Sequence, residues 1–140
     1  MLSQDDFESL SSGLKEGQPQ ERVYALRSII EGPTRDTRLL PQLEALLKDD
    51  TPCVVSLPYL FGEVRWLAAH ALASERASLG QVTPVQLKAV PRPQEMNSLA
   101  LLAQQHGIQH RGGVPGMLEL FALLRQQGLL PVVDLTLPSH

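Results

Sequence analysis

The sequence has one cysteine, few aromatic residues and no long apolar run. Cys53 has no second cysteine with which to form an internal disulfide, and this usage is typical of a reducing compartment, so we expect a cytoplasmic protein. No stretch of about 18 apolar residues occurs, which excludes a membrane-spanning helix. The start, residues 1–6, is acidic where a secretory signal would be basic and then apolar, so we expect no such signal.

Positive charge is also scarce. The 140 residues, a length typical of one domain, include 12 Lys and Arg against 15 Asp and Glu, with no basic cluster. Because nucleic-acid binding depends on neutralising phosphates, this balance argues against DNA or RNA as a partner. Acids outnumber bases by 12 to 8 in residues 1–79. That surplus favours a basic protein partner through electrostatic steering, although a merely solvated surface would have the same charge.

Apolar residues at helical spacing predict four helices in the first 80 residues. Ser3 and Asp6 have the spacing of a capping box, which predicts the start of the first. Together with Gly and Pro punctuation, the apolar spacing places the four at about 4–16, 20–31, 39–48 and 62–79. The residues expected on the buried stripe of the second helix are Val23, Leu26 and Ile30.

The four helices resemble one helical hairpin written twice. Four residues of the first hairpin recur 33 positions later, and two more recur 41 positions later. The matching sets are Leu10, Leu14, Lys15 and Pro19 with Leu43, Leu47, Lys48 and Pro52, then Val23 and Leu26 with Val64 and Leu67. The difference in spacing corresponds to an insertion at residues 53–60. A period of this size is typical of stacked helical hairpins, although two amphipathic hairpins can also match by coincidence.

The second hairpin resembles a HEAT repeat. Residues 40–52 (LPQLEALLKDDTP) are similar to the first helix and turn of such a repeat, and residues 64–72 (VRWLAAHAL) are similar to its second helix. The resemblance implies that a turn aspartate, Asp49 or Asp50, and the arginine after the valine, Arg65, tie neighbouring repeats together.

The first hairpin departs from this pattern at two positions. Gly17 replaces the turn aspartate, and Arg22 precedes the valine instead of following it. With the first hairpin included, the resemblance covers residues 3–79. It implies a scaffold whose surfaces bind another macromolecule.

Residues 81–140 have a different pattern. Alternating apolar and polar residues predict strands at 85–90 and 131–137, and helical spacing predicts helices near 96–107 and 115–128. Because two lone strands are marginal, we expect them to pair as a small ribbon packed on these helices. The expected fold is therefore mainly α (α+β): two HEAT-like hairpins in residues 1–80, and a two-stranded β ribbon with two helices in residues 81–140, packed as one globular unit.

The candidate metal and nucleophile residues have weak support. His106 and His110 have the spacing of a zinc-binding pair on a helix, but Gly107 separates them and no third ligand is near in sequence. We therefore expect no metal. Cys53 follows acidic residues, which disfavour the thiolate, so we expect an inert thiol.

Two further candidates lack the partners that catalysis needs. His70 lies between Glu63 and Glu75, but no nucleophile motif accompanies it. The glycine loop 112–116 precedes a helix, where anions can bind, but it has no phosphate-binding lysine. We expect no cofactor and no enzymatic activity. The alternative is a small-ligand protein or enzyme that uses the seam between the two halves, with His70, His106 or the glycine loop.

The insertion is the strongest functional candidate in the sequence. It places aromatic and apolar residues where a repeat would have a short turn, and such anchors are typical of protein-binding surfaces. The residues predicted to contact a partner are Asp49, Asp50, Leu57, Tyr59, Phe61, Glu63 and Arg65. A self-association patch and a segment that folds over the core are the alternatives.

The sequence therefore favours a non-enzymatic protein-interaction module. It would be a small cytoplasmic adaptor or an immunity-type protein that neutralises a toxin, with Tyr59 and Phe61 as anchors. A protein partner is expected, with a homodimer as the alternative, and neither nucleic acid nor a membrane is expected as a partner.

Overall fold

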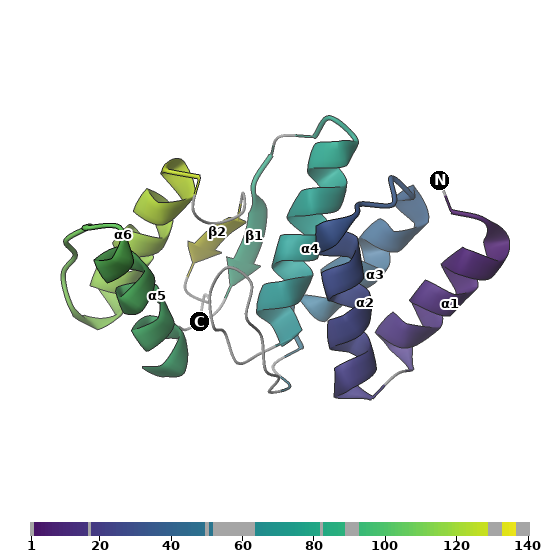
Figure 1. The fold of residues 1–140 in the computed structure, drawn as a ribbon, viewed down its shortest axis with the longest axis horizontal. Helices are drawn as coiled ribbons and strands as arrows, with labels where there is room; N and C mark the ends of the chain where they lie inside the picture. The colour runs from purple at the N-terminus through teal and green to yellow at the C-terminus, as the bar shows by residue number, and fades with distance from the viewer. Residues whose placement is uncertain are drawn as a thin grey trace. The chain divides into compact units, whose positions relative to one another are not determined.

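The computed structural model describes residues 2–16, 18–49, 51, 64–81, 83–88, 93–128 and 133–136. Among them lie six α-helices, one 3-10 helix and a two-stranded sheet, which confirms the expected mainly α (α+β) class (Figure 1). The described residues up to Thr83 form one compact unit, and those from Pro84 onward form a second. No helix in this described part is both long and apolar enough to cross a membrane.

The first unit contains α1 (Gln4–Lys15), α2 (Pro19–Glu31), the 3-10 helix η1 (Thr37–Leu39), α3 (Leu40–Leu46) and α4 (Val64–Ser78). The start of α1 is the one predicted, since the Ser3 Oγ accepts a hydrogen bond from the Asp6 amide at 3.2 Å. This bond satisfies one of the amides that a first turn leaves without an intrahelical partner. The expected third helix is shorter than predicted, because Leu39 belongs to η1 and the α-helix ends at Leu46.

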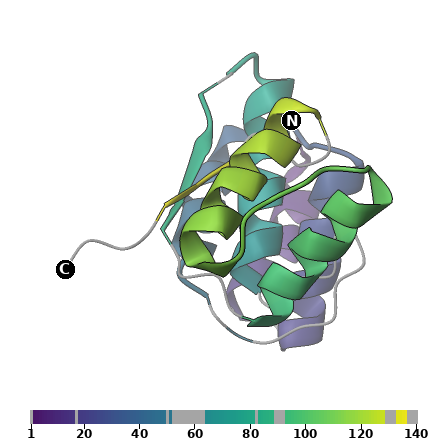
Figure 2. The ribbon, with the colours of Figure 1, turned by 90° about the vertical axis from the view of Figure 1, so that its left-hand side faces the viewer.

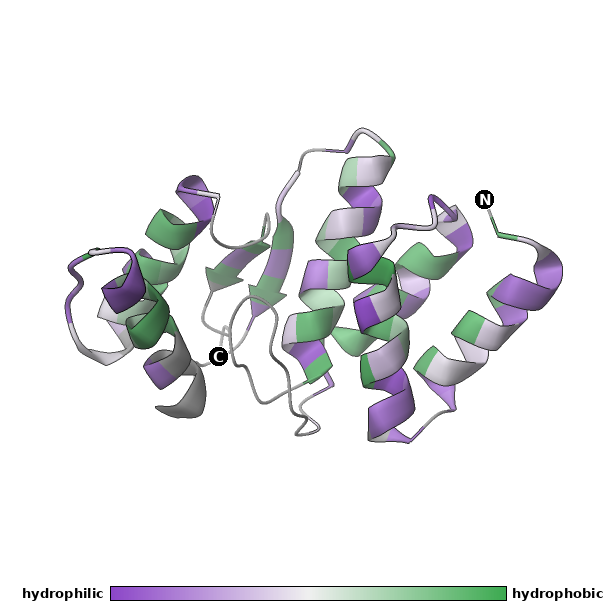
Figure 3. Cartoon of the chain, viewed as in Figure 1, coloured by the Kyte–Doolittle hydropathy of each residue, from purple (hydrophilic) through white to green (hydrophobic). Residues whose placement is uncertain are grey.

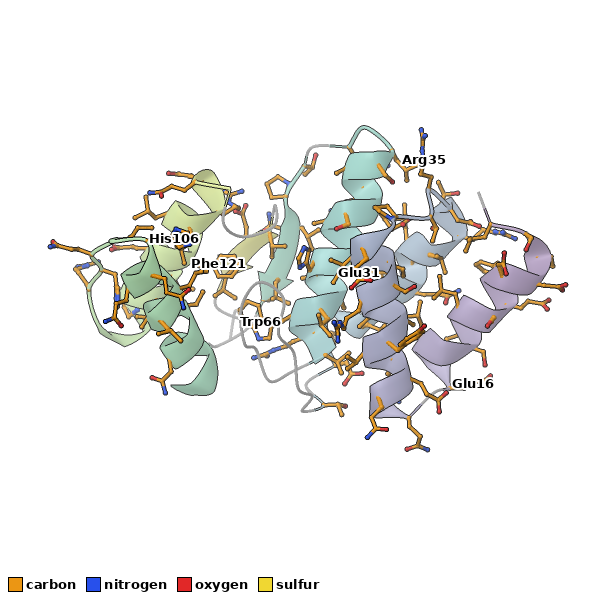
Figure 4. All side chains as sticks on the ribbon, in the orientation of Figure 1. Glu16, Glu31, Arg35, Trp66, His106 and Phe121 are labelled. Atoms are coloured by element: carbon orange, nitrogen blue, oxygen red, sulfur yellow. The ribbon has the colours of Figure 1, made fainter. Side chains whose placement is uncertain are left out.

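Helix α4 is the central helix of this unit. Both α2 and α3 pack against it (Figure 1). Four of its buried residues are alanines, at positions 68, 69, 71 and 73, and such small side chains allow neighbouring helices to approach closely. Trp66, Leu67 and Leu72 are its large buried side chains (Figure 4 labels Trp66).

The buried face of α2 differs from the predicted one. Leu26 is buried as expected, but its buried neighbours are Ala25 and Ile29, whereas Val23 and Ile30 are only half-buried. The reason is that α2 packs against both α1 and α4. Ala25 faces Gly13 of α1, where a Cβ would stand 3.6 Å from the Cβ of Ala25, so the closest approach uses two small residues.

The second unit contains β1 (Val85–Lys88), α5 (Pro93–Gln105), α6 (Gly113–Gln126) and β2 (Val133–Thr136). The two strands pair in parallel, with Val85 opposite Val133 and Leu87 opposite Leu135, so the expected strand pairing is confirmed. The parallel direction follows from the connection, because parallel strands need a long crossover and α5 and α6 lie within it.

The core of the second unit lies between α6 and the sheet. Helix α6 packs on β2 and on α5. Figure 2 shows α5 and α6 side by side. In Figure 3 hydrophobic residues alternate with hydrophilic ones along the strands and predominate on α6. Phe121, labelled in Figure 4, is buried on α6, and Arg125 of the same helix forms an ion pair with Asp134 of β2 at 3.0 Å.

Candidate functional site

Most of the predicted partner-binding residues lie outside the described residues. These are Asp50, Leu57, Tyr59, Phe61 and Glu63, together with Cys53 and the rest of the 53–60 insertion. Asp49 and Arg65 are described, and the structure brings their backbones together: the Arg65 amide donates a hydrogen bond to the Asp49 carbonyl oxygen at 2.8 Å.

Asp49 joins the two helical hairpins. One carboxylate oxygen accepts a hydrogen bond from the Arg22 guanidinium of α2 at 3.2 Å, and the other accepts one from the Thr51 amide at 2.9 Å. The arginine that pairs with Asp49 is thus Arg22, one of the two positions at which the first hairpin departs from the HEAT pattern. Since its carboxylate is engaged on both sides, Asp49 acts as a structural tie within the scaffold.

A second carboxylate holds the loop after α2. Glu75 of α4 is fully buried, and its carboxylate accepts hydrogen bonds from the Thr34 amide and, at 2.9 Å, from the Thr34 hydroxyl. The Glu75 carboxylate is therefore occupied by its hydrogen bonds to this loop. From the sequence, a pairing of Glu75 with His70 was the catalytic alternative. Nothing in the alanine-rich sequence around Glu75 distinguishes it from an exposed helical glutamate.

A third polar cluster fixes the start of α1. Asp36 is 1% exposed, and its carboxylate receives two guanidinium hydrogen bonds from Arg38, at 2.9 and 2.6 Å. These bonds lower the pKa of Asp36 to about 2. The Leu2 amide also donates to Asp36 at 3.3 Å, and the Arg38 guanidinium lies 4.0 Å from the ring centroid of Phe7.

The candidate histidines have different environments. His70 is half-buried on α4, and desolvation lowers its pKa to about 4, so its imidazole is neutral at pH 7. His106 lies in the turn after α5 (Figure 4), and His110 lies in the loop before α6; both are exposed. Within the described ranges, no three or more His, Cys, Asp or Glu residues gather where they could hold a metal ion.

The predicted glycine loop 112–116 does not precede a helix, because α6 begins at Gly113 and includes four of its five residues. A Cβ at Gly116 would overlap the carbonyl oxygen of Arg111, so only glycine fits where the loop before α6 meets the first turn of the helix. Arg111 also pairs with Glu119 of α6, with 3.1 Å between Nε and a carboxylate oxygen. These contacts hold the loop against α6 and account for Gly116 without an anion.

A groove between α1 and α2 is the best candidate for a binding site. Its volume is about 640 Å³, and it is lined by residues from both helices and from the segments that flank them. Leu10 and Ala25 are apolar lining residues, and Gly13 lines the place where the helices approach closely. Among the described residues, its charged lining consists of two carboxylates, Asp6 and Glu21.

Tyr24 stands at the rim of this groove. Its side chain is 79% exposed, the largest value among the exposed large hydrophobic residues of the described chain. The same ring borders a second depression on α2, of about 370 Å³, which Arg27 and Glu31 also line. Tyr24 is not among the residues predicted from the sequence, although the sequence carries a signal for it: it is an aromatic residue that lies off the apolar stripe of its helix.

The second unit has a weaker candidate surface. Leu101 of α5 is 49% exposed, and it lines a depression of about 690 Å³ together with Ile108. A neighbouring depression of about 380 Å³ shares His110 and is bordered by Leu123, which is 36% exposed. The described charged residues that line the neighbouring depression are Arg111 and Glu119, which neutralise each other.

In comparisons with known proteins, no protein family, no characterised protein and no solved structure matches this chain.

Proposed function

We propose that this protein is a non-enzymatic protein-interaction module, either a small adaptor or an immunity-type protein that neutralises a toxin. The groove between α1 and α2, with Tyr24 exposed at its rim, carries this proposal. Exposed aromatic side chains next to a recess are the usual anchors of protein interfaces, because they bury a large area with little loss of rotamer freedom.

The polar ties of the first unit support the proposal. The Arg22–Asp49 ion pair joins α2 to the turn after α3, and Glu75 holds the loop after α2 through Thr34. A surface that is fixed before binding loses less conformational entropy when a partner docks. The tie between hairpins also supports the HEAT-like interpretation, in which stacked hairpins serve as a scaffold for binding.

The insertion is proposed as a second contact surface. Its Leu57, Tyr59 and Phe61, with Asp50 and Glu63 beside them, are residues of the kind that interfaces use as anchors and rim. We further infer a cytoplasmic location, because a single cysteine is typical of proteins that work in reducing compartments.

Site-specific photo-crosslinking in the native host tests the groove. A photo-reactive phenylalanine analogue replaces Tyr24 in one variant and Glu16, at the end of α1 outside the groove, in the control (Figure 4 labels Glu16). We expect position 24 to capture a distinct protein that position 16 does not capture. The purified partner should then bind the protein with about tenfold lower affinity after Tyr24→Ala, as for an interface anchor.

Two outcomes would contradict the proposal. The first is a crosslink from position 24 only to a second copy of this chain, which would indicate self-association. The second is a partner whose affinity is unchanged by Tyr24→Ala, which would show that the groove is not the interface.

A further inference from the structure

We infer that the α1–α2 groove binds a short basic segment of the partner, with one arginine or lysine side chain on Asp6 and another on Glu21. The inference rests on the proposed function and names the chemistry of the partner segment. Three observations support it: the charge of the groove, the position of the two carboxylates along it, and the lining between them.

The charge of the groove is acidic and is not balanced locally. Asp6 and Glu21 are both exposed, and no ion pair within the described residues engages either carboxylate. No described basic residue lines the groove: Arg27 lines the second depression, and Arg22 and Arg38 are ion-paired with Asp49 and Asp36. A cation entering the groove therefore meets two carboxylates, whereas the guanidinium closest to the Asp6 end, that of Arg38, is already paired with Asp36.

The two acidic residues lie toward opposite ends of the groove. Asp6 is in the first turn of α1, whereas the backbone carbonyl of Glu21, in the first turn of α2, lies beside Gly13 of α1. Asp6 and Gly13 are seven positions apart on one helix, so the backbones of Asp6 and Glu21 are separated by about 10 Å along its axis. A segment in the polyproline II conformation has three residues per turn and rises about 3.1 Å per residue, so side chains three positions apart lie on one face and about 9 Å apart; this sets the spacing between its two basic side chains.

The helix dipoles leave this charge pattern in place. The two helices are joined by a short turn, so the end of α1 lies near the start of α2 (Figure 1); at the other end of the groove, Leu2 before α1 and Gly32 after α2 both line it. The partial positive charge of one terminus is therefore offset by the partial negative charge of its neighbour. The carboxylates of Asp6 and Glu21 then determine the local potential.

The lining between the carboxylates suits the stems of basic side chains. Leu10, which is half-buried, provides apolar surface on which the methylene groups of lysine or arginine can pack. The exposed ring of Tyr24 at the rim can take a guanidinium on its face. An acidic segment would gain the same apolar contacts but would be repelled by both carboxylates.

Fluorescence anisotropy with labelled peptides tests the inference on the full chain. The probe is a short peptide with two arginines separated by alanine and leucine; one control replaces both arginines with citrulline, and another replaces them with glutamate. We expect the arginine peptide to bind, the citrulline peptide to bind with an affinity lower by about tenfold or more, and the glutamate peptide not to bind. Added salt should weaken the arginine complex.

Matched charge variants locate the binding. The double variant Asp6→Asn with Glu21→Gln should weaken the arginine peptide by about five- to tenfold, since two partly screened ion pairs are lost. The control variant Asp5→Asn with Glu16→Gln removes the same charge from exposed positions outside the groove, and should change affinity by less than about twofold. Unchanged circular dichroism melts for both variants exclude unfolding as the cause.

Equal binding of the arginine and citrulline peptides overturns the inference, as does equal weakening by the two charge variants. The proposed function fails separately. If the partner crosslinked from position 24 binds the Asp6→Asn, Glu21→Gln variant with full affinity, the groove is an interface but its occupant is not basic. If the arginine peptide binds the groove but no protein is crosslinked there, the interaction module is wrong and the site is for a free cationic ligand.

Discussion

Single residues decide how firmly the first unit is held. Asp36, Glu75 and Asp49 are carboxylates that each receive hydrogen bonds from a loop or a guanidinium, and each joins segments distant in sequence. A carboxylate removed from water is stabilising only while its hydrogen bonds are complete, because an unpaired buried charge is costly. The loss of a single one of these carboxylate charges should therefore lower the free energy of unfolding of the whole first unit.

Asp36→Asn tests this at a carboxylate that is almost fully buried. The amide keeps the size of the side chain but loses the charge that receives both Arg38 hydrogen bonds, so we expect unfolding to be easier by about 2 kcal/mol. Urea denaturation followed by circular dichroism measures the difference. Asp5→Asn, at an exposed position of α1, is the control and should stay within about 0.5 kcal/mol of the wild type. Equal free energies of unfolding for the two variants would show that the Asp36 carboxylate does not stabilise the first unit.

Packing at the scale of helices depends on small residues at a few crossing points. Gly13 meets Ala25 between α1 and α2, and Gly116 meets the Arg111 carbonyl where the loop crosses α6. The first contact has room for one more methyl group, whereas the second has none. The two glycines are therefore unequal in what they tolerate.

Gly116→Ala should destabilise the second unit by about 2 to 3 kcal/mol, because the added methyl overlaps a backbone carbonyl and the loop must move away from α6. Gly112→Ala is the matched control: nothing lies within 4 Å of its Cβ position, and we expect a smaller cost of about 0.5 to 1 kcal/mol, because alanine is a poorer N-cap residue than glycine. Hydrogen exchange of the α6 amides locates the effect. Equal protection of α6 in the two variants would contradict the close crossing.

Helices with local signals could be predicted from the sequence, and side-chain networks could not. Ser3 and Asp6 are three residues apart, so their cap is visible in the sequence itself. The pairing of Arg22 with Asp49 depends on how two hairpins stack, and the HEAT resemblance pointed to Asp49 but not to this arginine. The buried face of α2 was misjudged because alanine and glycine form its closest contact, and neither stands out in an apolar pattern.

The candidate groove was missed for a related reason. A groove is formed by two helices together, and the identity of its lining residues follows only from their relative rotation. Tyr24 could have been singled out, since an aromatic residue on the polar side of an amphipathic helix lacks a core role. Asp6 and Glu21 gave no such signal, because exposed acids are ordinary in a first helical turn.

At the scale of the whole molecule, stability should fall when the solution is acidified. The pKa of His70 is lowered from 6.5 to about 4 in the folded chain, so below pH 6.5 the unfolded state takes up a proton that the folded state does not. The folded state loses up to about 3 kcal/mol of stability from this difference as the pH falls from 6.5 to 4. Asp36, with its pKa lowered from 3.8 to about 2, adds a loss below pH 3.8.

Urea titrations at about pH 7 and about pH 4.5 measure the histidine effect. The decrease in unfolding free energy from the higher pH to the lower pH should be smaller in His70→Leu than in the wild type. It should persist in His106→Gln, which removes an exposed imidazole. If His70→Leu shows the full fall, other groups are responsible for the acid sensitivity.

The parallel pairing of β1 with β2 has a consequence for synthesis of the chain. All the described elements of the first unit lie within residues 1–83, so they are synthesised before the second unit and can fold first. The partner of β1 is encoded after α5 and α6, so residues 85–88 leave the ribosome long before residues 133–136. During that interval Val85 and Leu87 belong to a strand with no partner, the kind of nascent segment on which holdase chaperones act.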